Sequence, residues 1–204
     1  MPKYLAMIVL TLVLLGCNKI PDSSMSQSQE VINDVTKYFP AKIHSTWIYQ
    51  GEGNEYASFS RKIVALNNNR IQVIENNGGT QQTMVFKISS DEIKRTFFLP
   101  EFYTESTILD EPDNASEMIL KAPLSKNAVW EDSISRRQVV SVNEQVTVPA
   151  GHFSNVIMIK ITSIKEQVND SQLFEYYAPN VGLIKREYTT GDNYKVISKL
   201  ASYK

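Results

Sequence analysis

The chain contains little of the chemistry on which catalytic and metal sites are usually built. It has one cysteine, Cys17, and two histidines, His44 and His152, in 204 residues. One cysteine excludes an intrachain disulfide framework, and two histidines exclude a three-histidine zinc site. Ser45 lies beside His44, but neighbouring residues on a strand point to opposite faces, so they are not expected to act as nucleophile and base. We therefore predict that the protein is not an enzyme and uses no metal or cofactor.

An excess of charge of one sign and a long apolar run are also absent. Lys and Arg total 21 against 22 Asp and Glu, so no strong field attracts nucleic acid, and we expect no such partner. Asp110, Glu111 and Asp113 lack the alternating spacing and closing glutamate of a calcium loop, and we interpret them as a solvated turn. The apolar run Leu5–Leu15 is shorter than the roughly 20 residues that a membrane-spanning helix needs.

That apolar run has the layout of a secretory signal peptide. Lys3 precedes it, Thr11 is its single polar member, and the string LLGC at residues 14–17 ends it. LLGC resembles the lipobox of bacterial lipoproteins, in which the cysteine sulfur receives a diacylglyceryl group and the peptide before it is removed. The resemblance implies acylation of Cys17, with chains such as palmitate, and anchoring on the extracytoplasmic face of a bacterial cell membrane. The alternative is that Cys17 is an ordinary small residue of a cleaved signal.

This arrangement predicts three segments: a signal peptide at residues 1–16, a lipidated cysteine with a flexible tether at residues 17–37, and one all-β domain at residues 38–204. Asn18–Gln29 contains four serines, one proline and few large apolar side chains, which is typical of a spacer. Within Glu30–Phe39 the apolar residues have the spacing of one helical face. A short N-terminal helical segment is therefore expected there.

After Pro40 the pattern changes to the period of two residues that is typical of β-strands. Asn- and Gly-rich turns separate β-branched and aromatic segments, among them Ile71–Ile74, Met84–Ile88, Asn155–Thr162 and Tyr194–Leu200. No helical pattern of crossover length lies between them, so we predict a mainly β fold with an antiparallel sheet, either a curved sheet or a half-barrel. Gly151 is expected to permit a sharp reversal between two strands.

Part of the pattern occurs twice. Pro40 and Trp47 have the same spacing as Pro123 and Trp130, and a similar string follows each tryptophan, SRKIV at residues 60–64 and SRRQV at residues 135–139. We predict two repeated meanders with a buried tryptophan near the start of each. The alternative is that any all-β chain yields such spacings by chance.

Three strings, in this order, resemble an uncharacterised family of bacterial exported proteins and lipoproteins: YFPAKIHSTWIY at residues 38–49, VTVPAGHFSNV at residues 146–156 and YYAPNVGLIKRE at residues 176–187. That family usually has glycine at the position of His44 and a small polar residue at that of His152, so the resemblance implies no role for histidine. A more distant similarity, to the curved-sheet, apolar-cavity fold of lipoprotein carriers, concerns the fold alone.

Aromatic residues give the remaining hint of function. They gather in one loop region (Phe97, Phe98, Phe102, Tyr103) and before Pro179 (Tyr176, Tyr177). Such clusters suit a stacking platform for sugars, a mouth for acyl chains, or simple strand packing.

From these features we predict a non-enzymatic binding module for an apolar or envelope-derived ligand: a lipid, a glycan or an envelope protein. The alternative is a structural or interaction lipoprotein that contacts other envelope proteins through its sheet edges. An open cavity lined by Phe, Ile and Met would favour binding, and a filled core with a flat exposed strand would favour interaction. The sequence assigns no individual ligand-binding residue.

Overall fold

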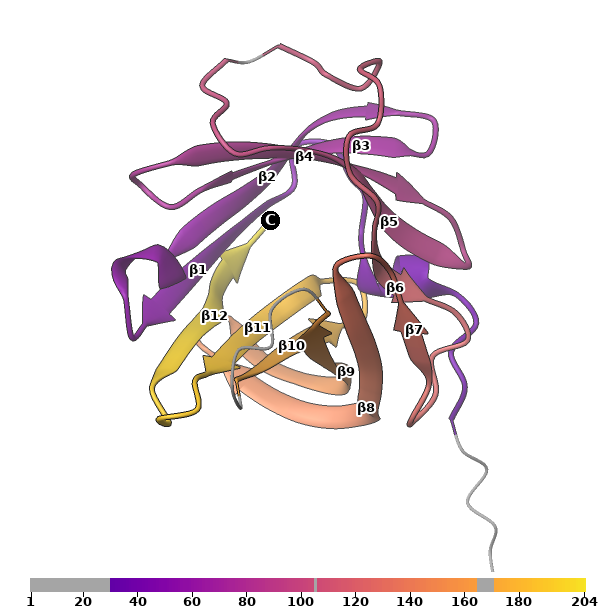
Figure 1. The fold of residues 1–204 in the computed structure, drawn as a ribbon, viewed down its shortest axis with the longest axis vertical. Coiled ribbons are helices and arrows are strands. Elements are labelled where there is room, and N and C mark those ends of the chain that lie inside the picture. Colours follow the sequence, from indigo (N-terminus) through magenta and orange to yellow (C-terminus); the bar gives the residue numbers. More distant parts are fainter. Residues whose placement is uncertain (1–29, 105, 165–170) are drawn as a thin grey trace, which may run out of the picture.

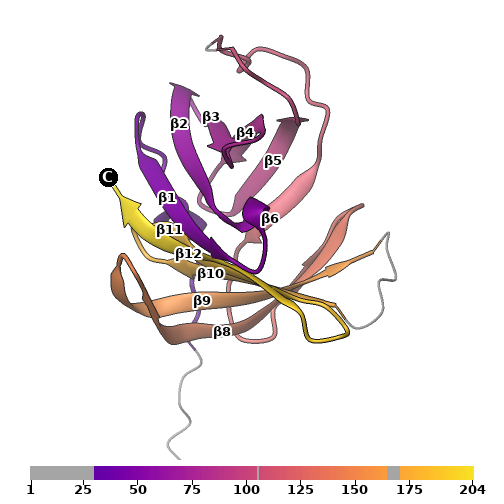
Figure 2. The ribbon, with the colours of Figure 1, turned by 90° about the vertical axis from the view of Figure 1, so that its left-hand side faces the viewer.

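The computed structural model describes residues 30–104, 106–164 and 171–204. They form one antiparallel sheet of twelve strands, in the order β6-β5-β4-β3-β2-β1-β12-β11-β10-β9-β8-β7. The sheet curls into a nearly closed, barrel-like shape (Figures 1 and 2), which confirms the predicted mainly β, antiparallel, curved fold. The strands are β1 (Thr46–Glu52), β2 (Phe59–Asn67), β3 (Arg70–Asn76), β4 (Gln81–Ile88), β5 (Glu92–Leu99), β6 (Glu117–Lys121), β7 (Val129–Glu131), β8 (Ser135–Val148), β9 (Gly151–Ser163), β10 (Gln172–Ala178), β11 (Gly182–Thr189) and β12 (Lys195–Tyr203).

The period of two residues determines which side chains face the interior. In β9, Ile157, Ile159 and Ile161 are all buried, as their spacing predicts. Several tight turns hold an asparagine at positive φ, for example Asn180 at 62°, a conformation that asparagine tolerates. Gly151 has a φ of 142°, so the predicted reversal between β8 and β9 is confirmed.

The sheet closes at two seams of different kinds. β1 and β12 pair through an antiparallel ladder whose register shifts once, between Ile48 and Tyr49. β6 and β7, which lie side by side in Figure 1, are joined by side chains instead. The Trp130 indole Nε1 donates to the Met118 carbonyl at 2.9 Å, and the Met118 N–H donates to Asp132 Oδ2 at 2.8 Å.

A short 3-10 helix, η1 (Val35–Tyr38), covers one end of the interior. The Val35 N–H donates to the Ser90 carbonyl in the β4–β5 turn at 2.9 Å, and the Asn180 N–H donates from the β10–β11 turn to the Lys37 carbonyl at 2.6 Å. Since these two turns come from opposite halves of the sheet, η1 links them across the end of the apolar core.

The helical segment expected over Glu30–Phe39 is not confirmed as such. Only the single turn of η1 forms, and Ile32 makes a β-bridge with Leu124. The apolar spacing arises because Ile32 and Val35 both pack on the barrel core. These residues, which we assigned to the tether, therefore already belong to the folded part of the chain.

The connection between β5 and β6 covers the outer face of β3 and β4. Phe102, Ile108 and Leu109 form a second apolar cluster with Val85. Gln72, which is fully buried, holds this connection in place: its side chain accepts a hydrogen bond from the Ile108 N–H at 3.0 Å and donates to the Ser106 carbonyl at 3.2 Å. Phe102 is thus a packing residue here, as the strand-packing alternative predicts.

The two halves of the sheet share a register. Each has six strands, Trp47 and Trp130 are both buried, and each occupies the second position of the first strand of its half. Trp47 pairs with Arg61 of β2, and Trp130 pairs with Arg137 of β8. The predicted burial of both tryptophans is confirmed, and this shared register supports the duplication, which stays a prediction until the halves are superposed.

Candidate functional site

A layer of charged side chains crosses the interior beyond the apolar core. Four arginines and three glutamates, from seven different strands, line one cavity of about 120 Å³. These residues are Arg61, Glu75, Arg95, Glu117, Arg137, Glu175 and Arg186. We call them the charged layer.

Most of the charged layer is one continuous chain of ion pairs. Arg95 pairs with Glu117, which also pairs with Arg137 at 2.6 Å. Arg137 contacts Glu175 at 3.2 Å, and Glu175 in turn contacts Arg186 at 3.0 Å. Each of the two glutamates therefore holds two guanidinium groups.

The remaining members are a separate pair. Arg61 of β2 binds Glu75 directly opposite on β3, and Gln82 of β4 donates a hydrogen bond to the other Glu75 oxygen at 3.3 Å. The Tyr177 hydroxyl donates to Glu175 at 2.6 Å from within the same strand. Each of these buried charges thus has a charged or hydrogen-bonding partner, which a charge in a protein interior requires.

The field of the arginines fixes the charge state of this layer. Burial alone would raise the pKa of Glu175, but Arg186 and Arg137 outweigh it and lower that pKa to about 2. Burial raises the pKa of Tyr49 and of Tyr177 well above the ordinary value for tyrosine. At neutral pH Glu175 is therefore ionised and both tyrosines are neutral.

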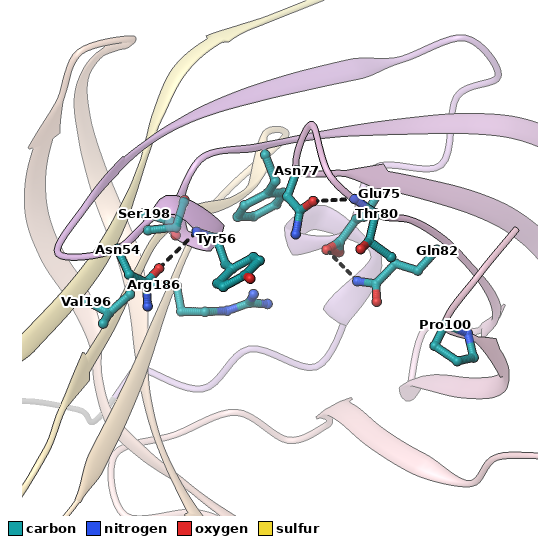
Figure 3. Close-up of a pocket in the computed structure, with 12 residues that line it drawn as sticks. Asn54, Tyr56, Glu75, Asn77, Thr80, Gln82, Pro100, Arg186, Val196 and Ser198 are labelled. Carbon is teal, nitrogen blue, oxygen red and sulfur yellow. Dashed lines mark hydrogen bonds between the residues drawn. The ribbon is translucent and has the colours of Figure 1, made fainter. Parts of the chain in front are cut away.

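A hollow of about 450 Å³ lies next to the charged layer and is shown in Figure 3. We call it the first hollow. Its walls carry amide, hydroxyl and aromatic side chains together with Glu75 and Arg186 of the charged layer: Asn54, Tyr56, Ala57, Phe59, Glu75, Asn77, Thr80, Gln82, Pro100, Arg186, Val196 and Ser198.

Tyr56 is the most exposed of the large side chains in the first hollow, at 64%. It lies on the 3-10 turn η2 (Glu55–Ala57), which begins where Asn54 Oδ1 accepts a hydrogen bond from the Tyr56 N–H at 3.0 Å. The Tyr56 ring and the Arg186 guanidinium point into the same space (Figure 3). The site thus offers an aromatic face and a partly exposed cation together.

A second hollow of about 380 Å³ lies on the β8–β11 side and shares Arg186 with the first. Its lining includes three more members of the charged layer, Glu117, Arg137 and Glu175, with Ser135, Ile161, Leu173 and Tyr188. The charged layer therefore forms part of the wall of both openings.

Comparison with known families matches β3 to β12 but not η2 or β2, which contribute Tyr56 and Phe59 to the first hollow. The model of the family described as DUF3108-like matches residues 68–203, which run from the β2–β3 turn to the end of β12. The chain belongs to the DUF3108-like family.

Two solved structures resemble this DUF3108-like chain, each with a TM-score of 0.49. One is a protein of Bacteroides fragilis described as exported and as having a YmcC-like fold, with 14% sequence identity. The other is a protein of Parabacteroides distasonis described as a lipoprotein, with 16% identity. Each match covers 82% of this chain and 98% of the other. Among curated proteins nothing matches.

The apolar cavity that would have favoured an acyl ligand is not found among the described residues of the DUF3108-like chain. The apolar hollow between Phe39, Trp47 and Leu183 holds only about 20 Å³, too little for an acyl chain. Large side chains fill most of that end, and the larger hollows have mixed walls, in which aromatic and aliphatic groups lie beside amide, hydroxyl and charged groups. Because charged side chains stand in both walls, these hollows suit a ligand with polar as well as apolar groups better than a bare lipid tail.

Neither histidine belongs to this site. His44 and His152 are exposed and line neither hollow. His44 has a φ of 68°, the conformation that glycine adopts most easily, which explains why a glycine suits this position in the resembling family. His152 Nδ1 lies 2.9 Å from the Thr147 hydroxyl.

Other candidate residues are also placed outside the hollows. Asp110, Glu111 and Asp113 are exposed, and Asp113 pairs with Arg70 at 2.9 Å. Within residues 30–104, 106–164 and 171–204, no three His, Cys, Asp or Glu side chains are grouped as metal ligands, and no helix is long and apolar enough to cross a bilayer. Residues 1–16 and Cys17 lie outside the described residues.

Sequence reasoning missed the charged layer. Arg61 and Arg137 lie within the two repeated strings, but a charged residue in a strand usually faces solvent, so they received no role. Their position in the strand could have revealed their burial. Arg61 lies two positions before Ile63, and Arg137 lies two positions before Val139. Side chains at i and i+2 of a strand point to the same face, so both arginines must face the core as these apolar residues do.

Proposed function

We propose that the mature protein is a lipid-anchored extracytoplasmic binding module without catalytic activity, and that its ligand is a polar envelope molecule, in the first place a glycan. The lipobox string at residues 14–17 supports the anchor and the location. The Ser-rich segment Asn18–Gln29 supports a spacer that holds the barrel away from the membrane surface.

The observation that carries the glycan proposal is the first hollow. A sugar ring has apolar C–H faces and hydroxyl edges, so it binds where an aromatic ring lies near amide and hydroxyl groups. Tyr56 supplies such a ring, and Asn54, Gln82 and Ser198 lie in the same walls. A volume of about 450 Å³ falls in the usual range for small-molecule sites.

The charge states of the layer support binding rather than catalysis. A general acid or base works best when its pKa lies near the operating pH. Here the pKa of Glu175 is driven down to about 2, and the pKa of Tyr177 is driven far up. Both groups therefore keep one protonation state at neutral pH, which suits a rigid scaffold.

A groove on the outer face of the sheet supports the alternative function, an interaction with another envelope protein. A groove of about 480 Å³ runs on the outer face of the sheet, with the exposed residues Tyr103, His44 and Asn76 in its walls. The strand edges themselves, β6 and β7, contact each other. An envelope protein would therefore dock on the outer groove rather than on a free edge.

Native mass spectrometry of the protein purified from membranes in mild detergent tests both proposals. We expect a fraction of molecules to carry a hexose-containing species, and we expect Tyr56→Ala to reduce that fraction roughly tenfold through loss of the aromatic contact. Tyr103→Ala is the matched control, because Tyr103 is 65% exposed against 64% for Tyr56.

The outcomes separate the alternatives. Loss of the bound species in Tyr103→Ala but not in Tyr56→Ala would place the ligand in the outer groove. A co-purified molecule with acyl chains and no sugar would contradict the glycan proposal.

A further inference from the structure

Buried polar atoms without a hydrogen-bond partner gather in and beside one part of the charged layer. Six buried side-chain nitrogen or oxygen atoms of the described residues have no hydrogen-bond partner, and four of them belong to Arg95, Glu117, Ser135 and Arg137. Buried polar groups in folded proteins nearly always have a partner, so a group of such atoms calls for an explanation.

Two of these four atoms are hydrogen-bond donors on residues that line the second hollow. They are the Ser135 hydroxyl and the Arg137 Nε. The two residues are separated by two positions in β8 and so face the same side, and each is only 4% exposed. Glu117 Oε2, by contrast, lies in an ion pair with Arg95.

The charge balance of the layer indicates what kind of group would satisfy these donors. Four arginines face three glutamates in the hollows and the cavity between them. Arg61 and Glu75 neutralise each other, which leaves three arginines against two glutamates in the chain of ion pairs. One positive charge is uncompensated there, and Arg137 is the middle arginine of that chain.

We propose that the second hollow is an oxyanion site, in which a carboxylate or phosphate group of a small molecule accepts hydrogen bonds from Ser135 Oγ and Arg137 Nε. Arg186 lies in the same wall and adds a second cation. Such an anion would satisfy both donors and would balance the excess charge. The volume of about 380 Å³ leaves room for the rest of the molecule beside Leu173 and Tyr188.

Glu117 and Glu175 do not exclude an anion from this hollow. Each carboxylate is held by two guanidinium groups, so its charge is already compensated. The two proposed hydrogen-bond donors, Ser135 and Arg137, do not line the first hollow, so the variants below test the oxyanion site separately from the glycan, although Arg186 lies in both walls.

Thermal unfolding of the full chain in detergent, titrated with inorganic phosphate, acetate or glycerol 1-phosphate, tests this site. We expect the oxyanions to raise Tm in a saturable way, and Ser135→Ala to weaken their apparent affinity roughly tenfold by removing one charge-assisted hydrogen bond. In the absence of anion, Ser135→Ala should unfold at a temperature no lower than the wild type does, because its buried hydroxyl makes no hydrogen bond that the substitution could remove.

Thr96→Val is the matched control. The Thr96 hydroxyl is also buried without a partner, at 3% exposure, but Thr96 lines neither hollow. This variant should therefore respond to phosphate as the wild type does. A stronger response to glycerol 1-phosphate than to inorganic phosphate identifies a lipid headgroup or similar ester as the source, and the reverse identifies the free ion.

Ser135→Asp provides a second, independent readout. It places a carboxylate where the proposed anion binds, so we expect a higher Tm without added anion and no further rise with phosphate. A lower Tm for Ser135→Asp together with an unchanged phosphate response in Ser135→Ala would overturn the proposal. So would the absence of any oxyanion effect on the wild type, which would mean that the two donors are only hydrated.

Discussion

At the scale of single residues, the interior of this protein depends on charges that cannot be removed one at a time. Replacing a whole buried ion pair with apolar groups is often tolerated, but removing one partner leaves an uncompensated charge in the interior. Glu175 is the most connected member, since it contacts Arg137, Arg186 and Tyr177. Removal of the Glu175 charge should therefore destabilise the charged layer more than removal of any other single charge in it.

Glu175→Gln should lower the free energy of unfolding at pH 7 by about 3 kcal/mol. The pKa of Glu175 is lowered in the folded state, from an ordinary value of 4.5 to about 2. The stabilisation that it provides is thus complete above about pH 4.5 and is lost as pH falls toward 2. Urea unfolding across this range should show a steeper loss of stability in the wild type than in Glu175→Gln.

Glu131→Gln is the control for that experiment. Glu131 also pairs with an arginine, Arg136, at 2.8 Å, but both side chains are more than half exposed. Exposed ion pairs contribute little to stability, so Glu131→Gln should change the free energy of unfolding by no more than about 0.5 kcal/mol. Equal effects of the two variants would contradict the role that we give to burial.

At the scale of elements, the sheet depends on how the short strands β6 and β7 meet. No ladder joins them, and the hydrogen bond from Trp130 to the Met118 carbonyl crosses the seam. Trp47 makes an equivalent bond to the Val181 carbonyl at 2.8 Å, but β1 is held on both sides by ladders. Loss of the tryptophan hydrogen bond should therefore loosen the contact between β6 and β7, whereas β1 would still be held by its two neighbouring strands.

Trp130→Phe should lower the free energy of unfolding by about 1–3 kcal/mol, because it leaves the Met118 carbonyl without its partner in a partly buried place. Amide hydrogen exchange should accelerate in β6 and β7. Trp47→Phe is the control: it should lower the free energy of unfolding by a similar amount but should not accelerate amide exchange in β6 and β7. Unchanged exchange in Trp130→Phe would mean that Asp132 alone holds the two strands together.

At the scale of the whole molecule, the proposed anchor determines where the barrel works. Cys17→Ala should release the protein from the membrane fraction or leave the precursor uncleaved, because the acylated sulfur is lost. Cell fractionation with mass spectrometry of the mature N-terminus measures both results. Wild-type protein that is soluble and retains Met1 would refute the anchor.

Much of the fold could be predicted because it depends on local pattern. The period of two residues predicted strands such as Ile71–Ile74 and Asn155–Thr162, and β3 and β9 confirm them. The turn at Gly151 followed from backbone sterics alone. The segment around Val35 was misread because four apolar residues at helical spacing also suit a chain that crosses the end of a barrel.

The sequence by itself determined the antiparallel β fold and the burial of both tryptophans, since each depends on residue type and spacing along the chain. Only the tertiary structure decided that seven charged residues from seven strands meet inside the barrel. Their ion pairs join residues that are distant in sequence, Glu117 with Arg137 and Arg137 with Glu175, and no local pattern encodes such contacts. The same closure leaves only about 20 Å³ between the large apolar side chains at one end of the barrel, and the larger hollows that remain have walls of mixed polar and apolar character.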